Sequence, residues 1–365
     1  MMSNERIPLT PAPIRVPNTV LDDLRTRLRA TRFADDTGND DWYYGVAGNY
    51  LAELVEYWAD GYDWRKAEAG INENEQYDVV IDGVPVHFMR KPGAGPNPTP
   101  LILTHGWPWT DQMWTKVMGP LADPGAHGAD PAEAFNVIVA TLPGWGFSTP
   151  LPNNPDMNFW KTADLWHKLM TEVLGHRRYA AGGVDIGTLV TAQLAHKYAD
   201  ELYGIHIGTP VPLDMFNGDR AWDLTGGAQI PQDLPDDFRQ QIKSWNKRFA
   251  AHVAVQVLDP STLAAGLSDS PAGLLAWLLE RWANWSDNHG DVEAVFTKDD
   301  ILTNAMIYWV TNSIGTSVRA YSNAHRYPWT PSHDRKPAVQ APAGITLVGY
   351  KNPPGVTTER RVDDS

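Results

Sequence analysis

Hydrophobic and polar residues alternate along the chain in two periods, one typical of helices and one typical of strands. In residues 16–33 apolar positions recur three and four apart, and Asn18 stands before them as a candidate N-cap. A second helical pattern follows in residues 49–64. Residues 77–91 alternate with a period of two on both sides of Asp82-Gly83, a pair that favours a two-residue turn. The pattern predicts two helices and then a β-hairpin.

From residue 101 onwards, short apolar runs alternate with amphipathic stretches. The apolar runs close on Gly or Pro, or lead into a helical pattern, and they predict strands within residues 101–108, 135–146, 179–185, 202–210 and 343–350. Helical periodicity marks residues 163–176, where Gly175 ends the pattern, and residues 188–201. Strands that alternate with helices indicate an α/β domain with a mainly parallel sheet.

The stretch from 216 to 330 interrupts this alternation. It is rich in tryptophan, its periodicity is helical throughout, and it contains no convincing strand. We expect a helical lid inserted before the sheet resumes near residue 343. The predicted organisation is an N-terminal extension with the first hairpin (1–95), an α/β core (96–215), the lid (216–330) and the end of the core (331–365).

Composition and charge restrict the class of partner. The chain is 42% hydrophobic and 20% charged, as in ordinary globular proteins. A formal net charge of −14 disfavours nucleic acid and anionic membrane surfaces. No apolar stretch is long enough to span a membrane, and the absence of cysteine excludes disulfides and a thiolate nucleophile. We predict a soluble, cytoplasmic protein without metal or other cofactor, and the oligomeric state stays open, a homodimer included.

The central candidate for chemistry is Asp185, in the stretch AGGVDIGTLV (181–190). A strand that leads into Gly183, Asp185 and Gly187 and then into a helix is the context of a nucleophile elbow. Small residues on both sides relieve crowding in such a turn, and the central side chain points out of the sheet. The alternative is an ordinary turn or N-cap aspartate, which is common.

Two further loops follow predicted strands, HGWP (105–108) and LPGWGFS (142–148). Carboxyl ends of parallel strands meet at one edge of the sheet, where open α/β sheets bind ligands. In α/β-hydrolases the main-chain N–H after the nucleophile and one from the first loop form an oxyanion hole. Here these would be the N–H groups of Ile186 and Trp107. We expect His105 to support its loop from a buried position rather than to act as a base.

Together these motifs resemble the microsomal-type epoxide hydrolases, which have an N-terminal extension before an α/β-hydrolase core. The resemblance runs from about residue 7 to residue 350. It is carried by YWADGYDWRKAEAGIN, IDGVPVHFMR, HGWPW, LPGWGFS, GGVDIG, LSDSPAGLLAWLLERWANW and LTNAMIYWVTNSIGTSVRAY.

The resemblance implies a two-step reaction on a small hydrophobic epoxide. A carboxylate opens the epoxide to form an ester, and water activated by a histidine then hydrolyses the ester. By position, Asp185 is the nucleophile, the N–H groups of Trp107 and Ile186 form the oxyanion hole, and Tyr321 is one of two lid tyrosines that hold the epoxide oxygen. The many tryptophans suggest an aromatic or bulky apolar epoxide.

The sequence also departs from the family pattern. His252 stands where the other lid tyrosine is expected, and its protonation depends on pH in a way that tyrosine's does not. The family's charge-relay acid corresponds in position to Lys351, with Asn352 and Glu359 nearby, and none of the three is a convincing match.

The family's general base lies in a Gly-Gly-His-Phe segment, and the sequence stops at Ser365 without one. His325 and His333 are weak substitutes. We therefore expect a core without its last strand and helix, a strand at 344–350 with an open edge, and a carboxylate that is alkylated but not released. A truncated chain, a degenerate protein and an edge completed by a partner are equally compatible with the sequence.

Two other functions fit parts of the pattern. A hydrolase-like protein that only binds a hydrophobic ligand under its lid would not need the missing histidine. A haloalkane dehalogenase would use the same aspartate elbow, but it would carry Trp at position 186 and usually Asn at position 107, where this chain has Ile and Trp. An esterase is disfavoured because no serine occupies the elbow.

Overall fold

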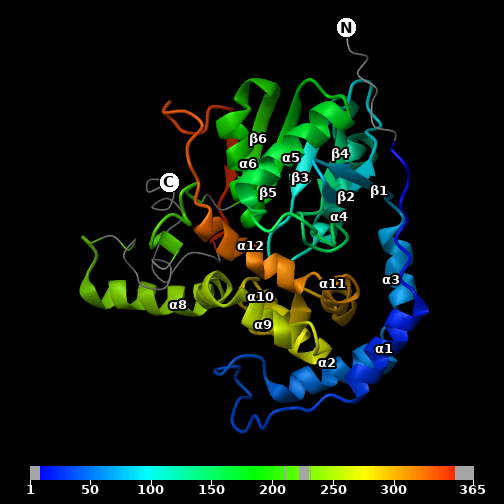
Figure 1. The fold of residues 1–365 in the computed structure, drawn as a ribbon, viewed down its shortest axis with the longest axis vertical. Helices are drawn as coiled ribbons and strands as arrows, with labels where there is room; N and C mark the ends of the chain where they lie inside the picture. Colours follow the sequence, from blue (N-terminus) through cyan, green and yellow to red (C-terminus); the bar gives the residue numbers. More distant parts are fainter. Residues whose placement is uncertain (1–8, 209–210, 222–229, 231, 350–365) are drawn as a thin grey trace.

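The computed structural model describes residues 9–208, 211–221, 230 and 232–349. A seven-stranded sheet forms the centre, with strand order β1-β2-β4-β3-β5-β6-β7 (Figure 1). The strands are β1 (Glu75–Ile81), β2 (Val84–Lys91), β3 (Thr99–Thr104), β4 (Phe135–Ala140), β5 (Tyr179–Val184), β6 (Leu202–Gly208) and β7 (Ala343–Thr346). β1 and β2 are antiparallel, β2 is antiparallel to β4, and all other neighbours are parallel. The predicted α/β class and mainly parallel sheet are confirmed.

The predicted hairpin forms at the expected turn. Ile81 pairs with Val84, which leaves Asp82 and Gly83 as a two-residue turn. Both turn residues have positive φ, 52° and 78°, as the tightest hairpin turns require. The Asp82-Gly83 turn therefore sets the register in which β1 pairs with β2.

Alternating side chains bury both faces of the sheet. On one face Ile102 and Ile138 join the large core beneath α5 (Phe159–Lys168) and α6 (Ile186–Lys197). On the other face Leu103 and Val139 join a smaller core beneath α4 (Thr115–Ala122). Helix α6 is buried over nearly its whole length, so its apolar residues do not follow one stripe. The sheet is thus covered on both sides, as parallel sheets require.

Five helices lie over the carboxyl ends of the parallel strands (Figure 1). We call them the lid helices: α8 (Asp236–Leu258), α9 (Pro260–Leu267), α10 (Pro271–Asn284), α11 (Lys298–Val310) and α12 (Ile314–Arg326). The described residues between 216 and 330 contain no strand, in agreement with the prediction for this stretch.

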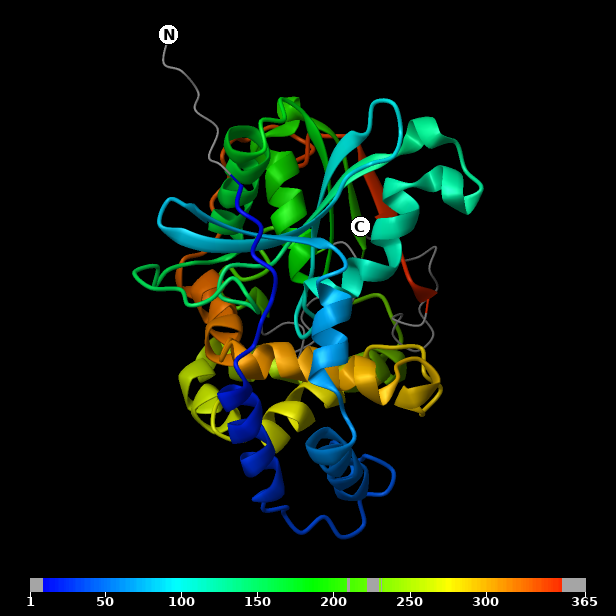
Figure 2. The same ribbon diagram turned by 90° about the vertical axis from the view of Figure 1, so that its right-hand side faces the viewer.

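Of the three N-terminal helices, the first two pack on the lid helices from the side away from the sheet, and the third runs alongside the lid toward the sheet (Figure 2). They are α1 (Asn18–Arg29), α2 (Gly48–Asp60) and α3 (Trp64–Ile71). The Tyr57 hydroxyl donates to Asp299 Oδ1 at 2.8 Å, and the Tyr62 hydroxyl lies 2.9 Å from Thr303 Oγ1. These bonds fix α11 against the N-terminal extension.

Of two helix ends predicted from the sequence, one differs in the structure and one is as expected. α1 begins at Asn18 itself, with Pro17 at the N-cap position, and the Asn18 side chain accepts a hydrogen bond from Arg65. The prediction of an Asn18 cap was therefore wrong, because a tertiary partner uses its oxygen. α5 ends at Lys168 and continues as a π-helical turn (Leu169–Val173), and Gly175 with φ 75° ends the helical path as predicted.

Short 3₁₀ helices connect several elements. They span Asp111–Trp114, Pro124–His127, Pro131–Glu133, Ala199–Glu201 and Val292–Ala294. β7 is the last strand in the sheet order and pairs with β6 on one side, and its Ile345 is 50% exposed. The described residues contain no helix that is both long and apolar enough to cross a membrane.

Candidate active site

Asp185 occupies the sharp turn between β5 and α6, with φ 55° and ψ −123°. This conformation is rare for a residue with a side chain. The turn also requires glycine at both flanking positions. A Cβ on Gly183 would lie 2.2 Å from the Gly187 carbonyl oxygen, and a Cβ on Gly187 would lie 2.3 Å from the Thr104 carbonyl oxygen. Asp185 stands at the N-cap position of α6, but its side chain makes no capping bond to the helix.

The HGWPW loop (residues 105–109), which follows β3, meets Asp185 directly. The Trp107 main-chain N–H donates to Asp185 Oδ1 at 3.0 Å. Gly106 makes this approach sterically feasible, because a Cβ there would lie 2.4 Å from the Asp185 Cβ. Ile186 is the first residue of α6, and the first N–H groups of a helix have no intrahelical acceptor. Of the two N–H groups predicted from the sequence, that of Trp107 lies on the Asp185 carboxylate, and that of Ile186 stands at the start of α6 directly after Asp185.

Tyr321 from α12 and His252 from α8 complete this cluster from the lid side. The His252 ring stacks on the Trp107 indole with centroids 5.2 Å apart and planes 5° apart. The Tyr321 ring meets Trp107 edge-on at 6.3 Å and His252 edge-on at 5.9 Å. Both side chains are buried. The structure therefore brings together all five residues predicted for the site, although their separation in sequence is large.

Burial sets the protonation of the two lid residues. Burial, and then the charge of Asp185, raise the pKa of Tyr321 well above its usual value, so the phenol keeps its proton. Burial, and then the nearby Arg281 charge, lower the pKa of His252 well below its usual value. The imidazole is therefore neutral at neutral pH. Its Nδ1 is buried and has no hydrogen-bond partner in the described part of the chain.

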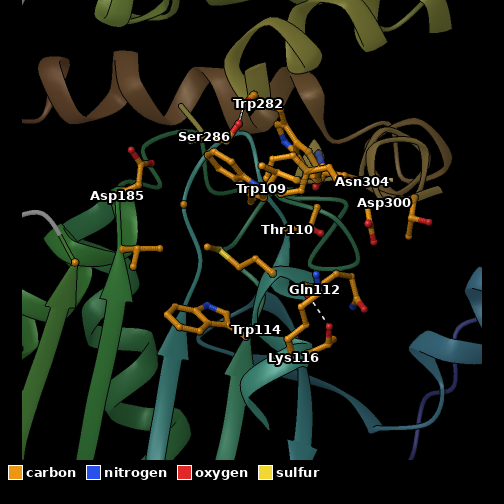
Figure 3. A pocket seen from close by; sticks show the side chains of 18 of the residues that line it. Trp109, Thr110, Gln112, Trp114, Lys116, Asp185, Trp282, Ser286, Asp300 and Asn304 are labelled. Carbon is orange, nitrogen blue, oxygen red and sulfur yellow. Dashed lines mark hydrogen bonds between the residues drawn. The ribbon is translucent and has the colours of Figure 1, made fainter. Parts of the chain in front are cut away.

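A cavity of about 1090 Å³ opens beside Asp185. Its walls near the carboxylate are aromatic: Trp109 stacks on Trp282 at 5.6 Å and on Trp285 at 6.1 Å. Figure 3 shows the Asp185 carboxylate pointing away from the sheet toward the lid helices, with Trp109 and Trp282 on the same cavity. The arrangement can hold a bulky apolar molecule with a reactive carbon near a carboxylate.

Sequence reasoning missed two residues of α11. Tyr308 is fully buried, and its hydroxyl donates to the Trp109 carbonyl oxygen at 3.4 Å. Burial, and then the Asp185 charge, raise the pKa of this phenol too. Asn304 donates from Nδ2 to the Pro108 carbonyl oxygen at 2.9 Å. Both residues lie in the stretch LTNAMIYWVTNSIGTSVRAY that carries the family resemblance, but the sequence analysis assigned a role there to Tyr321 alone.

The histidines considered from sequence lie elsewhere or serve the loops. His105 is fully buried, and its Nε2 accepts from the Leu142 N–H at 3.1 Å, which joins the HGWPW and LPGWGFS loops as expected. His325 Nδ1 lies 3.2 Å from the Phe216 carbonyl oxygen, and His333 Nε2 lies 2.7 Å from the His196 carbonyl oxygen. Both substitutes for a base are therefore bound to main-chain carbonyls.

The three positions considered for a relay acid, Lys351, Asn352 and Glu359, lie outside the described residues. Within the described ranges no group of three or more His, Asp or Glu side chains is arranged to hold a metal ion.

Comparison with known proteins assigns the chain to a family. Residues 9–112 match the family profile described as "Epoxide hydrolase N terminus", and residues 99–261 match the "alpha/beta hydrolase fold". A protein of Stigmatella aurantiaca (strain DW4/3-1) named as an epoxide hydrolase is 37% identical over 317 residues, covering 86% of this chain and 69% of the relative. The chain belongs to the epoxide hydrolase family.

Other relatives agree with this assignment. "Epoxide hydrolase 1" of Oryctolagus cuniculus is 30% identical to this epoxide hydrolase, over 86% of the chain and 72% of the relative. The crystal structure of juvenile hormone epoxide hydrolase from the silkworm Bombyx mori superposes with a TM-score of 0.74 at 25% identity, covering 95% of this chain and 83% of the silkworm chain. The α/β-hydrolase fold predicted from the sequence is confirmed.

Proposed function

We propose that this epoxide hydrolase uses Asp185 as the nucleophile that converts an epoxide to a vicinal diol. One Asp185 oxygen attacks an epoxide carbon, the carbon–oxygen bond of the ring breaks, and an ester of Asp185 forms with the ring oxygen left as an alkoxide. Water then adds to the ester carbonyl and the acyl–oxygen bond breaks. The diol leaves with both protons of the water, and the carboxylate is restored. The single observation that carries the proposal is the strained Asp185 turn with its carboxylate on the Trp107 N–H.

Tyr321 and His252 are the proposed donors to the epoxide oxygen. The opening ring places negative charge on that oxygen, and a phenol that keeps its proton stabilises this charge by a hydrogen bond. The neutral His252 imidazole offers a single N–H for the same purpose. Both rings contact the indole of Trp107, whose main-chain N–H lies on Asp185, and this places the two proposed donors next to the HGWPW loop.

The N–H groups of Trp107 and Ile186 are proposed to act in the second step. An ester on Asp185 puts the reacting carbonyl in the protein itself, so negative charge develops on an Asp185 oxygen when water adds. The Trp107 N–H is already 3.0 Å from one of these oxygens. Preorganised donors at that position are the main source of stabilisation in acyl transfer.

The aromatic walls favour a hydrophobic epoxide with an aromatic or bulky apolar substituent. Trp109, Trp282 and Trp285 present stacked rings around the cavity beside Asp185. Aromatic rings gain contact area and edge or stacking interactions with such a substituent.

We further propose that ester hydrolysis is the slow step in this 365-residue chain. Of the histidines considered, His105 is bound to the Leu142 N–H, His325 and His333 lie against main-chain carbonyls, and His252 is a weak base because its pKa is lowered. A water molecule therefore meets no strong base among these four side chains, and the ester is expected to accumulate.

The test is intact-protein mass spectrometry after exposure to styrene oxide. The wild-type chain should gain the mass of one epoxide, peptide mapping should place it on Asp185, and Asp185→Asn should abolish it. The matched control is Glu73→Gln, which changes another carboxylate that lines the cavity.

An adduct on Glu73, or none on any residue together with no diol, would contradict the proposal. Steady diol release without an accumulating adduct would contradict the slow second step alone. Thermal stabilisation by the epoxide that persists in Asp185→Asn without any adduct would indicate a ligand-binding protein.

A further inference from the structure

Lid helix α11 forms two hydrogen bonds to the HGWPW loop. Asn304 Nδ2 donates to the Pro108 carbonyl oxygen at 2.9 Å, and the Tyr308 hydroxyl donates to the Trp109 carbonyl oxygen at 3.4 Å. The two donors are four residues apart, so they lie on the same face of the helix. The two acceptors directly follow Trp107, whose N–H contacts Asp185.

These bonds matter because the loop lies outside the strands and helices. A buried main-chain carbonyl without a partner costs about 1–3 kcal/mol, and neither carbonyl belongs to a strand or helix ladder. Tyr308 is not exposed, and Asn304 is 6% exposed at the cavity wall, so both donors are largely shielded from bulk water. The lid therefore satisfies the polar groups of the loop that carries the Trp107 N–H.

We propose that Asn304 and Tyr308 are positioning residues that hold the HGWPW loop so that the Trp107 N–H stays on Asp185. We call the two hydrogen bonds from Asn304 and Tyr308 to the loop the clamp. The effect of the clamp on the reaction rests on the proposed function, but the clamp itself does not. Through the clamp, the position of α11 affects where the Trp107 N–H lies relative to Asp185. α11 is in turn bound to the N-terminal extension through Thr303, which lies 2.9 Å from the Tyr62 hydroxyl.

The loop is anchored from the opposite side as well. His105 Nε2 accepts from the Leu142 N–H, so the first residue of the loop is fixed to the LPGWGFS loop. At the other end of the loop, the Pro108 and Trp109 carbonyl oxygens accept from the lid donors Asn304 and Tyr308, and the His105 ring also interacts with the Trp109 carbonyl. Loss of these donors should therefore free the Pro108–Trp109 end and let the Trp107 N–H move, while the His105 end stays in place.

The test compares Asn304→Leu, which keeps the branched shape of the side chain but removes the donor, with Asn323→Leu. Asn323 is an equally well-matched amide, because it is also 6% exposed, lies on lid helix α12, and donates to the carbonyl oxygens of Pro155 and Met157 at 3.0 and 2.8 Å. Hydrogen exchange is measured on peptides that cover residues 104–110 and 152–158, and the formation and decay of the styrene oxide adduct are followed in single turnover.

We expect Asn304→Leu to speed exchange about tenfold in 104–110 and to leave 152–158 unchanged, with the reverse pattern in Asn323→Leu. Removal of a complete oxyanion donor slows reactions about 10²–10³-fold, so a displaced donor should slow ester decay about tenfold. Tyr308→Phe, which loses only one hydroxyl, should show the same signs with smaller effects.

Unchanged exchange in 104–110 for both Asn304→Leu and Tyr308→Phe would overturn the clamp whether or not the epoxide reacts. Faster exchange with unchanged adduct kinetics would overturn its role in the reaction. A wild-type chain that forms neither adduct nor diol refutes the proposed function, and the exchange data then decide the clamp separately. If Asn304→Leu does not fold, the same measurements on Tyr308→Phe decide the test.

Discussion

The main-chain N–H of Trp107 lies 3.0 Å from Oδ1 of Asp185, although the two residues are 78 positions apart in sequence. The contact follows from the parallel pairing of β3 with β5, which brings the loops after both strands to the same edge of the sheet. On its other side, Trp107 contacts the lid through its indole ring, which stacks on His252. Trp107 therefore links the elbow to the helices that cover it.

Gly106→Ala should abolish adduct formation and destabilise the fold. The new Cβ would lie 2.4 Å from the Asp185 Cβ, so the loop or the elbow must shift. Overpacking of this kind costs about 1–3 kcal/mol. The control is Gly266→Ala in α9, where a Cβ meets nothing within 4 Å and should stabilise the helix by about 0.5–1 kcal/mol. Urea unfolding and adduct mass measure both effects, and an active Gly106→Ala would contradict the contact.

Asp185→Gly should raise the free energy of unfolding by about 1 kcal/mol while it removes the reaction. The residue has φ 55° and ψ −123°, a conformation that costs a side-chain-bearing residue about 1–3 kcal/mol and glycine much less. The greater freedom of glycine in the unfolded chain offsets part of this gain. Asn312→Gly, at φ 48°, is the comparison, and it should change stability less because asparagine tolerates positive φ. Asp185→Ala loses the same bond from the Trp107 N–H but keeps a Cβ, so a glycine variant no more stable than the alanine variant would show that the turn carries no strain.

Acidification should destabilise the fold partly through His252. The pKa of His252 in the folded chain lies well below its unfolded value near 6.5, chiefly through burial. As pH falls below about 6.5 the unfolded chain therefore binds a proton that the folded chain does not, and stability falls by about 1.4 kcal/mol per pH unit for this group. His252→Gln should remove that part of the slope.

The measurement is urea unfolding between pH 7 and pH 5. Burial also lowers the pKa values of His105 and His196, so the slope should fall in His252→Gln but not vanish. His289→Gln changes an imidazole that is 88% exposed and serves as the control. Equal slopes in wild type and His252→Gln would show that the imidazole is protonated in the folded chain.

Trp282→Leu should weaken the reaction with a bulky aromatic epoxide more than with a small aliphatic one. The Trp282 ring stacks on Trp109 and forms part of the cavity wall. Loss of a stacked aromatic partner costs about 0.5–1.5 kcal/mol beyond the buried area, so we expect about a tenfold higher half-saturating concentration of styrene oxide and little change for propylene oxide. Trp58→Leu, in the core of the N-terminal extension, should change neither value. Equal effects on both epoxides would contradict a role of Trp282 in selectivity.

The sequence alone determined the features that depend only on residues close together along the chain. Strand and helix periods gave the α/β order, Asp82-Gly83 gave the hairpin register, and the small residues around Asp185 indicated the elbow. These features are local, because the turn chemistry and side-chain periodicity act within a few residues. The predicted Asn18 cap failed for the opposite reason, since its oxygen is used by Arg65 from another helix.

Only the tertiary structure decided how the site is assembled. The stack of His252 on Trp107 and the bonds from Asn304 and Tyr308 to the HGWPW loop join segments more than a hundred residues apart. No local pattern encodes such contacts, because they depend on which faces of the lid helices pack over the sheet. The protonation of His252 and Tyr321 was likewise decided by burial next to Arg281 and Asp185, which the chain order does not reveal.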